Sequence, residues 1–86
     1  MEINQLILLV KEKIEKNILV QKVIIIDKTY LHTKHLSHVK GKFHLEIRVK
    51  SEDLSKLSKI RATKKIYEIL DEEIRKYIHS IQILIN

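Results

Sequence analysis

The stretch FHLEIRVKS, residues 43–51, alternates between apolar and polar side chains along most of its length. Successive side chains of a β-strand point to opposite faces, so this pattern predicts a strand with one buried face and one face in water. The buried face is expected to hold Phe43, Leu45, Ile47 and Val49, and the wet face His44, Glu46, Arg48 and Lys50. The stretch HSIQILIN, residues 79–86, predicts a further strand with Ile81, Ile83 and Ile85 inward.

The segment between these two strands predicts a helix that begins at Ser58, a suitable N-cap, and ends near Tyr77. Its apolar residues recur at helical spacing, at Ala62, Ile66, Ile69, Leu70, Ile74 and Tyr77. Residues 51–57 are expected to form a turn or a short helical segment. A strand, a helix and a second strand in this order form a right-handed crossover in nearly all proteins, and the crossover makes the two strands parallel.

The first half of the chain adds a helix, a strand and a long loop. Residues 2–17 carry apolar side chains at helical spacing, and residues 19–27 are rich in β-branched side chains, which favour a strand. Residues 28–42 show no period and predict a loop. We therefore expect a single small α+β domain over residues 1–86, in the order α-β-β-α-β, with a three-stranded mixed sheet backed by helices.

The composition excludes several classes of function. The chain of 86 residues has no cysteine, so it can offer no thiol nucleophile, disulfide or thiolate ligand. It contains neither an HExxH metal motif nor a serine with a paired base, so we expect no enzyme activity. No apolar run reaches the length of a membrane span and no signal peptide opens the chain, so we expect a soluble, cytoplasmic protein. The net charge of +6 favours anionic partners, although a need for solubility would also explain it.

Histidine is concentrated in one part of the sequence. The five histidines are His32, His35, His38, His44 and His79. Parallel strands begin at the same end of a sheet, so His79 should lie near His44 and near the loop that leads into that strand. Converging imidazoles favour a metal bound by at least one pair of them. The alternative is a set of solvated loop histidines and one hydrogen-bonded structural histidine, because the HxxHxxH spacing is unspecific.

Three segments carry a resemblance to a known family: residues 27–51, 65–74 (KIYEILDEEI) and 78–83 (IHSIQI). The matching residues are Asp27, Thr29, Tyr30, His32, Gly41, His44, Val49, Ser51, Ile66, Tyr67, Leu70, Ile78, His79 and Ser80. Their order and spacing resemble the BolA-like family, in which the last three positions read Ile-His-Ala. The chain departs from the family where an Arg-His-Arg run is replaced by Ala62, Thr63 and Lys64.

The resemblance implies a class II KH-like fold and an adaptor that forms a heterodimer with a monothiol glutaredoxin. The two proteins would share a [2Fe–2S] cluster, with thiolates from the glutaredoxin and glutathione, in cluster trafficking or iron regulation. By its place in the family pattern, His79 corresponds to the cluster ligand of the last strand. The family has a second ligand in the long loop, for which His32 is the best match and His44 the next best. The isolated chain is expected to hold no cluster. Tyr30 is a candidate partner contact, and the formation of a weak homodimer stays open.

A basic segment supports an alternative function. The start of the long helix is crowded by Lys56, Lys59, Arg61, Lys64 and Lys65, with no acidic residue between positions 54 and 67. Cations oppose the helix dipole at an N-terminus, so they favour a role such as contact with DNA phosphates by a transcriptional regulator. Contact with an acidic protein face or with glutathione, or a merely solvated surface, would suit them too. RNA binding in the KH manner is excluded, because its GXXG loop needs two glycines and the chain has one.

Overall fold

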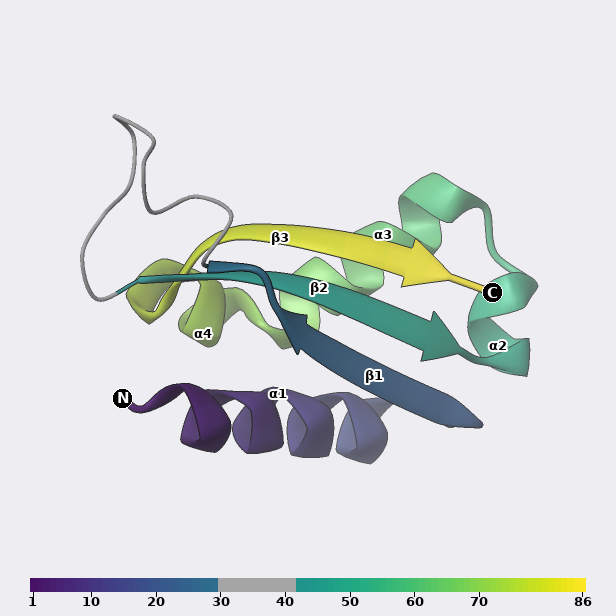
Figure 1. Cartoon of the computed structure of the whole chain (residues 1–86). Helices are drawn as coiled ribbons and strands as arrows, with labels where there is room; N and C mark the ends of the chain where they lie inside the picture. The colour runs from purple at the N-terminus through teal and green to yellow at the C-terminus, as the bar shows by residue number, and fades with distance from the viewer. Residues whose placement is uncertain (30–41) are drawn as a thin grey trace.

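The sheet is built around β2 (Phe43–Lys50), which lies between β1 (Lys22–Asp27) and β3 (Ile78–Ile85) in the computed structural model. The structure describes residues 1–29 and 42–86. Strand β1 runs antiparallel to β2, whereas β3 runs parallel to it (Figure 1). The parallel pairing confirms the predicted crossover, and the sheet is mixed as expected.

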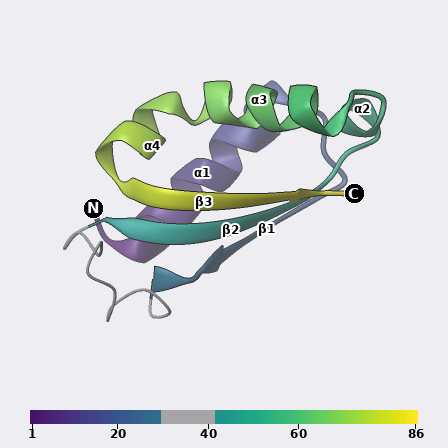
Figure 2. The same ribbon diagram turned by 90° about the horizontal axis from the view of Figure 1, so that it is seen from above.

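The helices of the described residues lie on one side of the sheet. They are α1 (Ile3–Asn17), α2 (Glu52–Ser55), α3 (Lys59–Ile69) and α4 (Asp71–Lys76). Seen from above, the three strands form one layer and the helices lie together on one of its faces (Figure 2). None of the helices within residues 1–29 and 42–86 is both long enough and apolar enough to cross a membrane.

Helix α1 is capped by side chains at both ends. The Glu2 carboxylate accepts hydrogen bonds from the backbone N–H groups of Asn4 and Gln5, and the Gln5 side chain accepts one from the backbone N–H of Glu2. This reciprocal arrangement is a capping box, which satisfies N–H groups that have no partner within the helix. At the other end the Asn17 amide donates to the carbonyl of Lys13. The predicted first helix is therefore confirmed.

The long helix predicted between Ser58 and Tyr77 is divided in the structure. It begins as predicted, because the Ser58 hydroxyl accepts a hydrogen bond of 3.2 Å from the backbone N–H of Arg61. At Leu70 the backbone leaves the helical region, with φ −98° and ψ 14°, and α4 starts at the next residue. The division redirects the chain so that α4 leads into the start of β3 (Figure 2). The segment before α3 contains the short helix α2, which Ser51 caps.

The core consists of aliphatic side chains packed between the helices and the sheet. Its buried members are Leu6, Val10, Ile14, Ile18, Leu45, Ile47, Val49, Leu54, Ala62, Ile66, Leu70 and Ile78. The inward face predicted for β2 is thus confirmed. Strand β1 starts three residues later than the predicted strand 19–27, since Leu19 is 70% exposed and its carbonyl accepts a hydrogen bond from the Ser51 hydroxyl.

The polar face of β2, predicted to lie in water, is buried in its first half. His44 is 4% exposed and Glu46 is 7% exposed, whereas Arg48 is exposed as predicted. The physical reason is the central place of β2, since Glu46 lies between Ile26 of β1 and Gln82 of β3. The Glu46 carboxylate also accepts a hydrogen bond of 2.7 Å from Arg48 Nε. The ion pair with Arg48 therefore offsets part of the cost of burying the Glu46 carboxylate.

An ion pair joins α1 to α4. Glu73 is 3% exposed, and both of its carboxylate oxygens accept hydrogen bonds of 2.9 Å from Lys13 Nζ. A buried carboxylate that loses its partner retains the full cost of its desolvation. The pair therefore links the N-terminal helix to the end of the crossover.

Replacing Lys13 with methionine should destabilise the fold by about 1–3 kcal/mol, because the buried Glu73 carboxylate loses both hydrogen bonds. Urea unfolding followed by circular dichroism measures the change. The double variant Lys13→Met/Glu73→Leu should recover most of the loss, since replacing both partners of a buried pair is often neutral. Lys16→Met, at an exposed position of the same helix, is the control. Equal stabilities of Lys13→Met and Lys16→Met would contradict this role of the pair.

Candidate functional site

An irregularity at the start of β3 decides where His79 lies. Phe43 of β2 is paired with Ile78, but the next residue, His44, is paired with Ser80, so His79 is an extra residue in β3. A bulge of this kind interrupts the alternation of side chains and re-aims the residue that it adds. The His79 ring lies beside the His44 ring, with 5.0 Å between the centroids and 65° between the planes.

His44 is held by hydrogen bonds to its side chain and to its backbone. Its Nδ1 lies 2.6 Å from the Ser80 hydroxyl oxygen, within hydrogen-bond distance. Its backbone N–H donates to the Thr29 hydroxyl at 3.1 Å, and its carbonyl accepts from the backbone N–H of Lys28 at 2.7 Å. Asp27 in turn accepts hydrogen bonds from the backbone N–H and the hydroxyl of Thr29. These bonds tie the residues after β1 to the start of β2.

The structure brings together two of the three predicted histidine ligands. His44 and His79 lie at the same end of the sheet, as the parallel crossover predicts. Outside the described residues lie His32, His35, His38 and Tyr30. The residues on either side of that segment lie close to His44. The Thr29 hydroxyl accepts a hydrogen bond from the His44 backbone, and Lys42 directly precedes β2.

The two imidazoles differ in what they can offer to a metal. His79 is exposed, whereas His44 is buried and its Nδ1 is engaged with Ser80. A neutral imidazole has one nitrogen lone pair that can bind a metal, so His79 can present a donor to a group that arrives from outside. Residues 1–29 and 42–86 contain no group of three or more His, Asp or Glu side chains that could hold a metal ion.

The predicted basic residues lie along α3, which begins at the opposite end of β3 from His79. Exposed positions on α3 are taken by Lys59, Arg61, Lys64 and Lys65. Lys59 lines a surface pocket together with Ile85 and Asn86. Ile85 is the last residue of β3, whereas His79 lies at its start. A strand rises about 3.3 Å per residue, so roughly 20 Å separate His79 from Ile85. The structure thus places the imidazoles and the basic residues in two separate regions.

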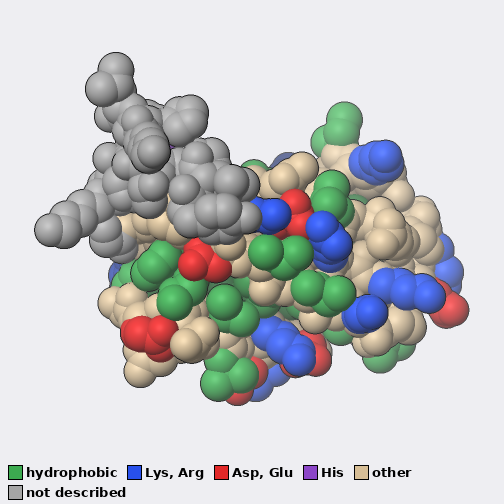
Figure 3. All heavy atoms as spheres, viewed as in Figure 1, with side chains coloured by type: hydrophobic (Ala, Val, Ile, Leu, Met, Phe, Trp, Pro, Cys, Tyr) green, Lys and Arg blue, Asp and Glu red, His purple; other side chains and the backbone are tan. Residues whose placement is uncertain are grey.

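The helix-free face of the sheet carries three basic strand residues, Lys22, Arg48 and Lys50, and one acidic strand residue, Glu46. Exposed Ile24 and Leu84 lie on this face beside Arg48, which is paired with Glu46. Figure 3 shows acidic, basic and apolar side chains interspersed on this side of the molecule. Basic residues are denser at the start of α3, where residues 59–65 hold four cations and no acidic residue, whereas Glu68 is exposed further along the helix.

Sequence reasoning did not assign Ser80 or Thr29 to the site. Both bond to His44, one at the side chain and one at the backbone. A signal for Ser80 was present, because a serine stands where the resemblance places alanine after Ile78 and His79. The bulge itself had no signal in the sequence, since it is a property of the register between β2 and β3.

Comparisons with known proteins show what this arrangement is similar to. A family model described as "BolA-like protein" matches residues 14–86. The solved BolA domain of SufE1 from Arabidopsis thaliana has a TM-score of 0.79 at 22% identity, covering 93% of this chain and 88% of that chain. BolA1 from Arabidopsis thaliana has a TM-score of 0.79 at 19% identity, with the same coverage of both chains.

A third solved structure, the BolA1 protein from Mus musculus, has a TM-score of 0.74 at 16% identity. That match covers 92% of this chain and 62% of the mouse chain. A search among curated proteins found no match. At these identities the solved structures show the fold alone, and they confirm the predicted α+β class.

Replacing Ser80 with alanine should release the His44 ring, because Nδ1 loses its hydroxyl partner. We expect a loss of about 0.5–1.5 kcal/mol in unfolding free energy. Long-range ¹H–¹⁵N spectra of the imidazoles should show a changed Nδ1 chemical shift for His44 in Ser80→Ala, because this nitrogen no longer has a hydroxyl partner. Ser55→Ala, which removes an exposed hydroxyl bonded to the Glu52 carbonyl, is the control. An unchanged His44 spectrum in Ser80→Ala would show that this bond does not orient the ring.

Proposed function

The chain belongs to the BolA-like family, and on that basis we propose that it is a non-catalytic adaptor that binds a monothiol glutaredoxin and shares a [2Fe–2S] cluster with it. The observation that carries the proposal is the pair of imidazoles at the start of β3, in which exposed His79 lies beside His44. The adaptor would serve cluster trafficking or iron regulation.

The donors of this chain suit a cluster whose other ligands come from a partner. The chain has no cysteine, so the thiolates must come from the glutaredoxin and from glutathione. His79 supplies an accessible nitrogen, and the second donor is His32, outside the described residues, or His44. A cluster that is ligated partly by neutral imidazole has a higher reduction potential than one ligated only by thiolates.

The residues around His79 determine how its imidazole is offered. The bulge sets its ring beside that of His44, and Ser80 holds the His44 ring in turn. Because both strands belong to the same sheet, the two rings are carried on rigid elements, which position a site more accurately than loops do. An imidazole binds iron only in its neutral form, so acid should weaken this ligation.

Mixing the protein with a cluster-loaded monothiol glutaredoxin should change the visible absorption and circular dichroism spectra, because an imidazole becomes an iron ligand. His79→Ala should remove the change. Gln82→Ala, at an exposed position of the same strand, is the matched control and should behave as the wild type. The second donor is identified by comparing His32→Ala with His44→Ala. The absence of a change on mixing, or the same change with His79→Ala, would reject shared ligation.

DNA binding is a second candidate function, and a specific observation favours it. Helices α2 and α3 follow one another with only residues 56–58 between them, which is the connection typical of a helix-turn-helix. The second helix of that motif enters the major groove with its N-terminal residues. In this chain those residues include exposed Lys59, Arg61 and Lys64.

Titration of duplex DNA at several salt concentrations tests this second function. If α3 contacts phosphates, Lys64→Gln/Lys65→Gln should weaken binding to all sequences alike. The plot of the log of the binding constant against the log of the salt concentration should then become less steep, by about 0.9 for each phosphate contact that is lost. Discrimination between sequences that persists at moderate salt would support a regulator. If binding to every DNA sequence disappears at moderate salt, it is non-specific charge attraction, and the regulator function is rejected.

A further inference from the structure

The outer edge of β3 is unusual for an edge strand. Within the described residues no strand is paired with this side of β3. Residues 78–85 contain no Lys, Arg, Asp, Glu or Pro. Exposed edges present unpaired N–H and C=O groups, and proteins commonly block them with charged residues, proline or bulges. Beyond the bulge at His79, β3 has none of these devices at its outer edge.

The register shows which main-chain groups face outward. The Asn86 N–H donates to the Val49 carbonyl of β2 at 2.9 Å. Alternate residues of a strand in a parallel pair direct both of their main-chain groups to the same side. Ile81, Ile83 and Ile85 therefore direct theirs away from β2. The Tyr67 hydroxyl lies 3.5 Å from the Ile81 carbonyl oxygen, which agrees with this assignment.

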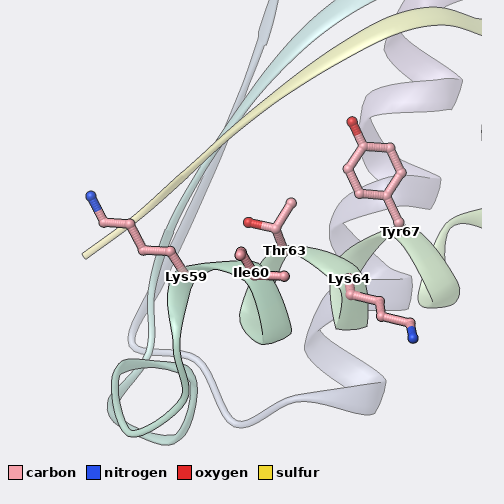
Figure 4. A pocket seen from close by; sticks show the side chains of 5 residues that line it. All are labelled: Lys59, Ile60, Thr63, Lys64 and Tyr67. Atoms are coloured by element: carbon pink, nitrogen blue, oxygen red, sulfur yellow. The ribbon is translucent and has the colours of Figure 1, made fainter.

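Helix α3 forms a wall beside this edge. Two surface pockets, of about 480 and 430 Å³, meet at Lys59 and Thr63, which line both. In the close view Lys59, Thr63 and Tyr67 extend from the same side of α3 (Figure 4). Ile60, which is 82% exposed, lines the first pocket, and Ile83 lines the second. The second pocket lies between α3 and the end of β3, and the first continues it along α3 alone. We refer to the two pockets together as the groove.

The rim of this groove is cationic. It carries Lys59 and Lys64, and no acidic residue lies between positions 54 and 67. Arg48 also lines it, but its charge is paired with Glu46. Two copies of this chain paired through β3 would bring the same cations together across a two-fold axis, and like charges oppose such an interface. An acidic occupant is attracted by them instead.

We propose that α3 and the outer edge of β3 form a docking site for an extended acidic segment of a partner protein. The segment adds to the sheet as a further strand at Ile83 and Ile85, each of which presents one N–H and one C=O. Its apolar side chains contact Ile60 and Thr63, and its carboxylates face Lys59 and the other rim cations. The proposal is independent of the shared cluster, because Lys59, Ile83 and Ile85 lie toward the opposite end of β3 from His79. An adaptor built in this way contacts two proteins at once.

The test uses the full chain labelled with ¹⁵N and a blocked peptide of alternating glutamate and valine, about eight residues long. The amides of Ile83 and Ile85 should become protected from hydrogen exchange when the peptide binds. The amides of Gln82 and Leu84 already face β2 and should change little. A peptide of alternating lysine and valine should not bind. No added protection, or shifts spread evenly over all lysines of the chain, would overturn the proposal.

Variants separate the two components of the site. Lys59→Glu/Lys64→Glu should weaken peptide binding about tenfold, because exposed ion pairs are each of modest strength. Lys11→Glu/Lys16→Glu makes the same change of charge on exposed positions of α1 and should have little effect. Ile85→Pro removes an outward N–H that no described strand uses, so it should weaken binding while leaving the pairing with β2 intact.

Two further results distinguish the alternatives. His79→Ala should bind the peptide as tightly as the wild type, so failure of cluster sharing would not affect this site. Sedimentation should show that the chain does not self-associate through β3. A concentration-dependent dimer that protects Ile83 and Ile85 without peptide would assign the edge to a second copy and overturn the proposal.

Discussion

The parallel pairing of β2 with β3 is the constraint on which the candidate site depends. Strands that run in the same direction need a crossover between them, and here α2, α3 and α4 provide it on one face of the sheet. Both strands therefore begin at one end, where His44 and His79 become neighbours although they are distant in the chain. A hairpin connection would have placed them at opposite ends. The same pairing leaves β3 at an edge of the sheet.

The bulge in β3 adds a second constraint, which acts on one residue. A bulge leaves one residue out of the ladder, and the regular pairing resumes at Ser80 and continues along the strand. Ile78, just before the bulge, keeps its place in the core at 2% exposure. His79 is therefore exposed, although Ile78 and Ser80 on either side of it are both paired with β2. Ser80 also contributes its hydroxyl to His44, so pairing and hydrogen bonding act on the same two imidazoles.

The crossover also separates two kinds of surface. Helix α3 begins near the end of β3, because the chain must return from the end of β2 to the start of β3. Lys59, at the start of α3, therefore lies at the opposite end of β3 from the imidazoles. Imidazole nitrogens at one end and a cationic, partly apolar groove at the other are chemically distinct.

The sequence by itself determined the elements and the fold class, because alternation and helical spacing are local signals of which face is buried. It also indicated that His79 and His44 share one end, since the crossover rule needs only the order of the elements. Only the tertiary structure decided that the long helix breaks at Leu70, that Glu73 pairs with Lys13 and that the His79 ring turns toward His44. The ion pair and the ring contact depend on residues distant in the chain, and continued alternation would have sent His79 to the core face. Local patterns carry no information on register, which is set only when the strands pack.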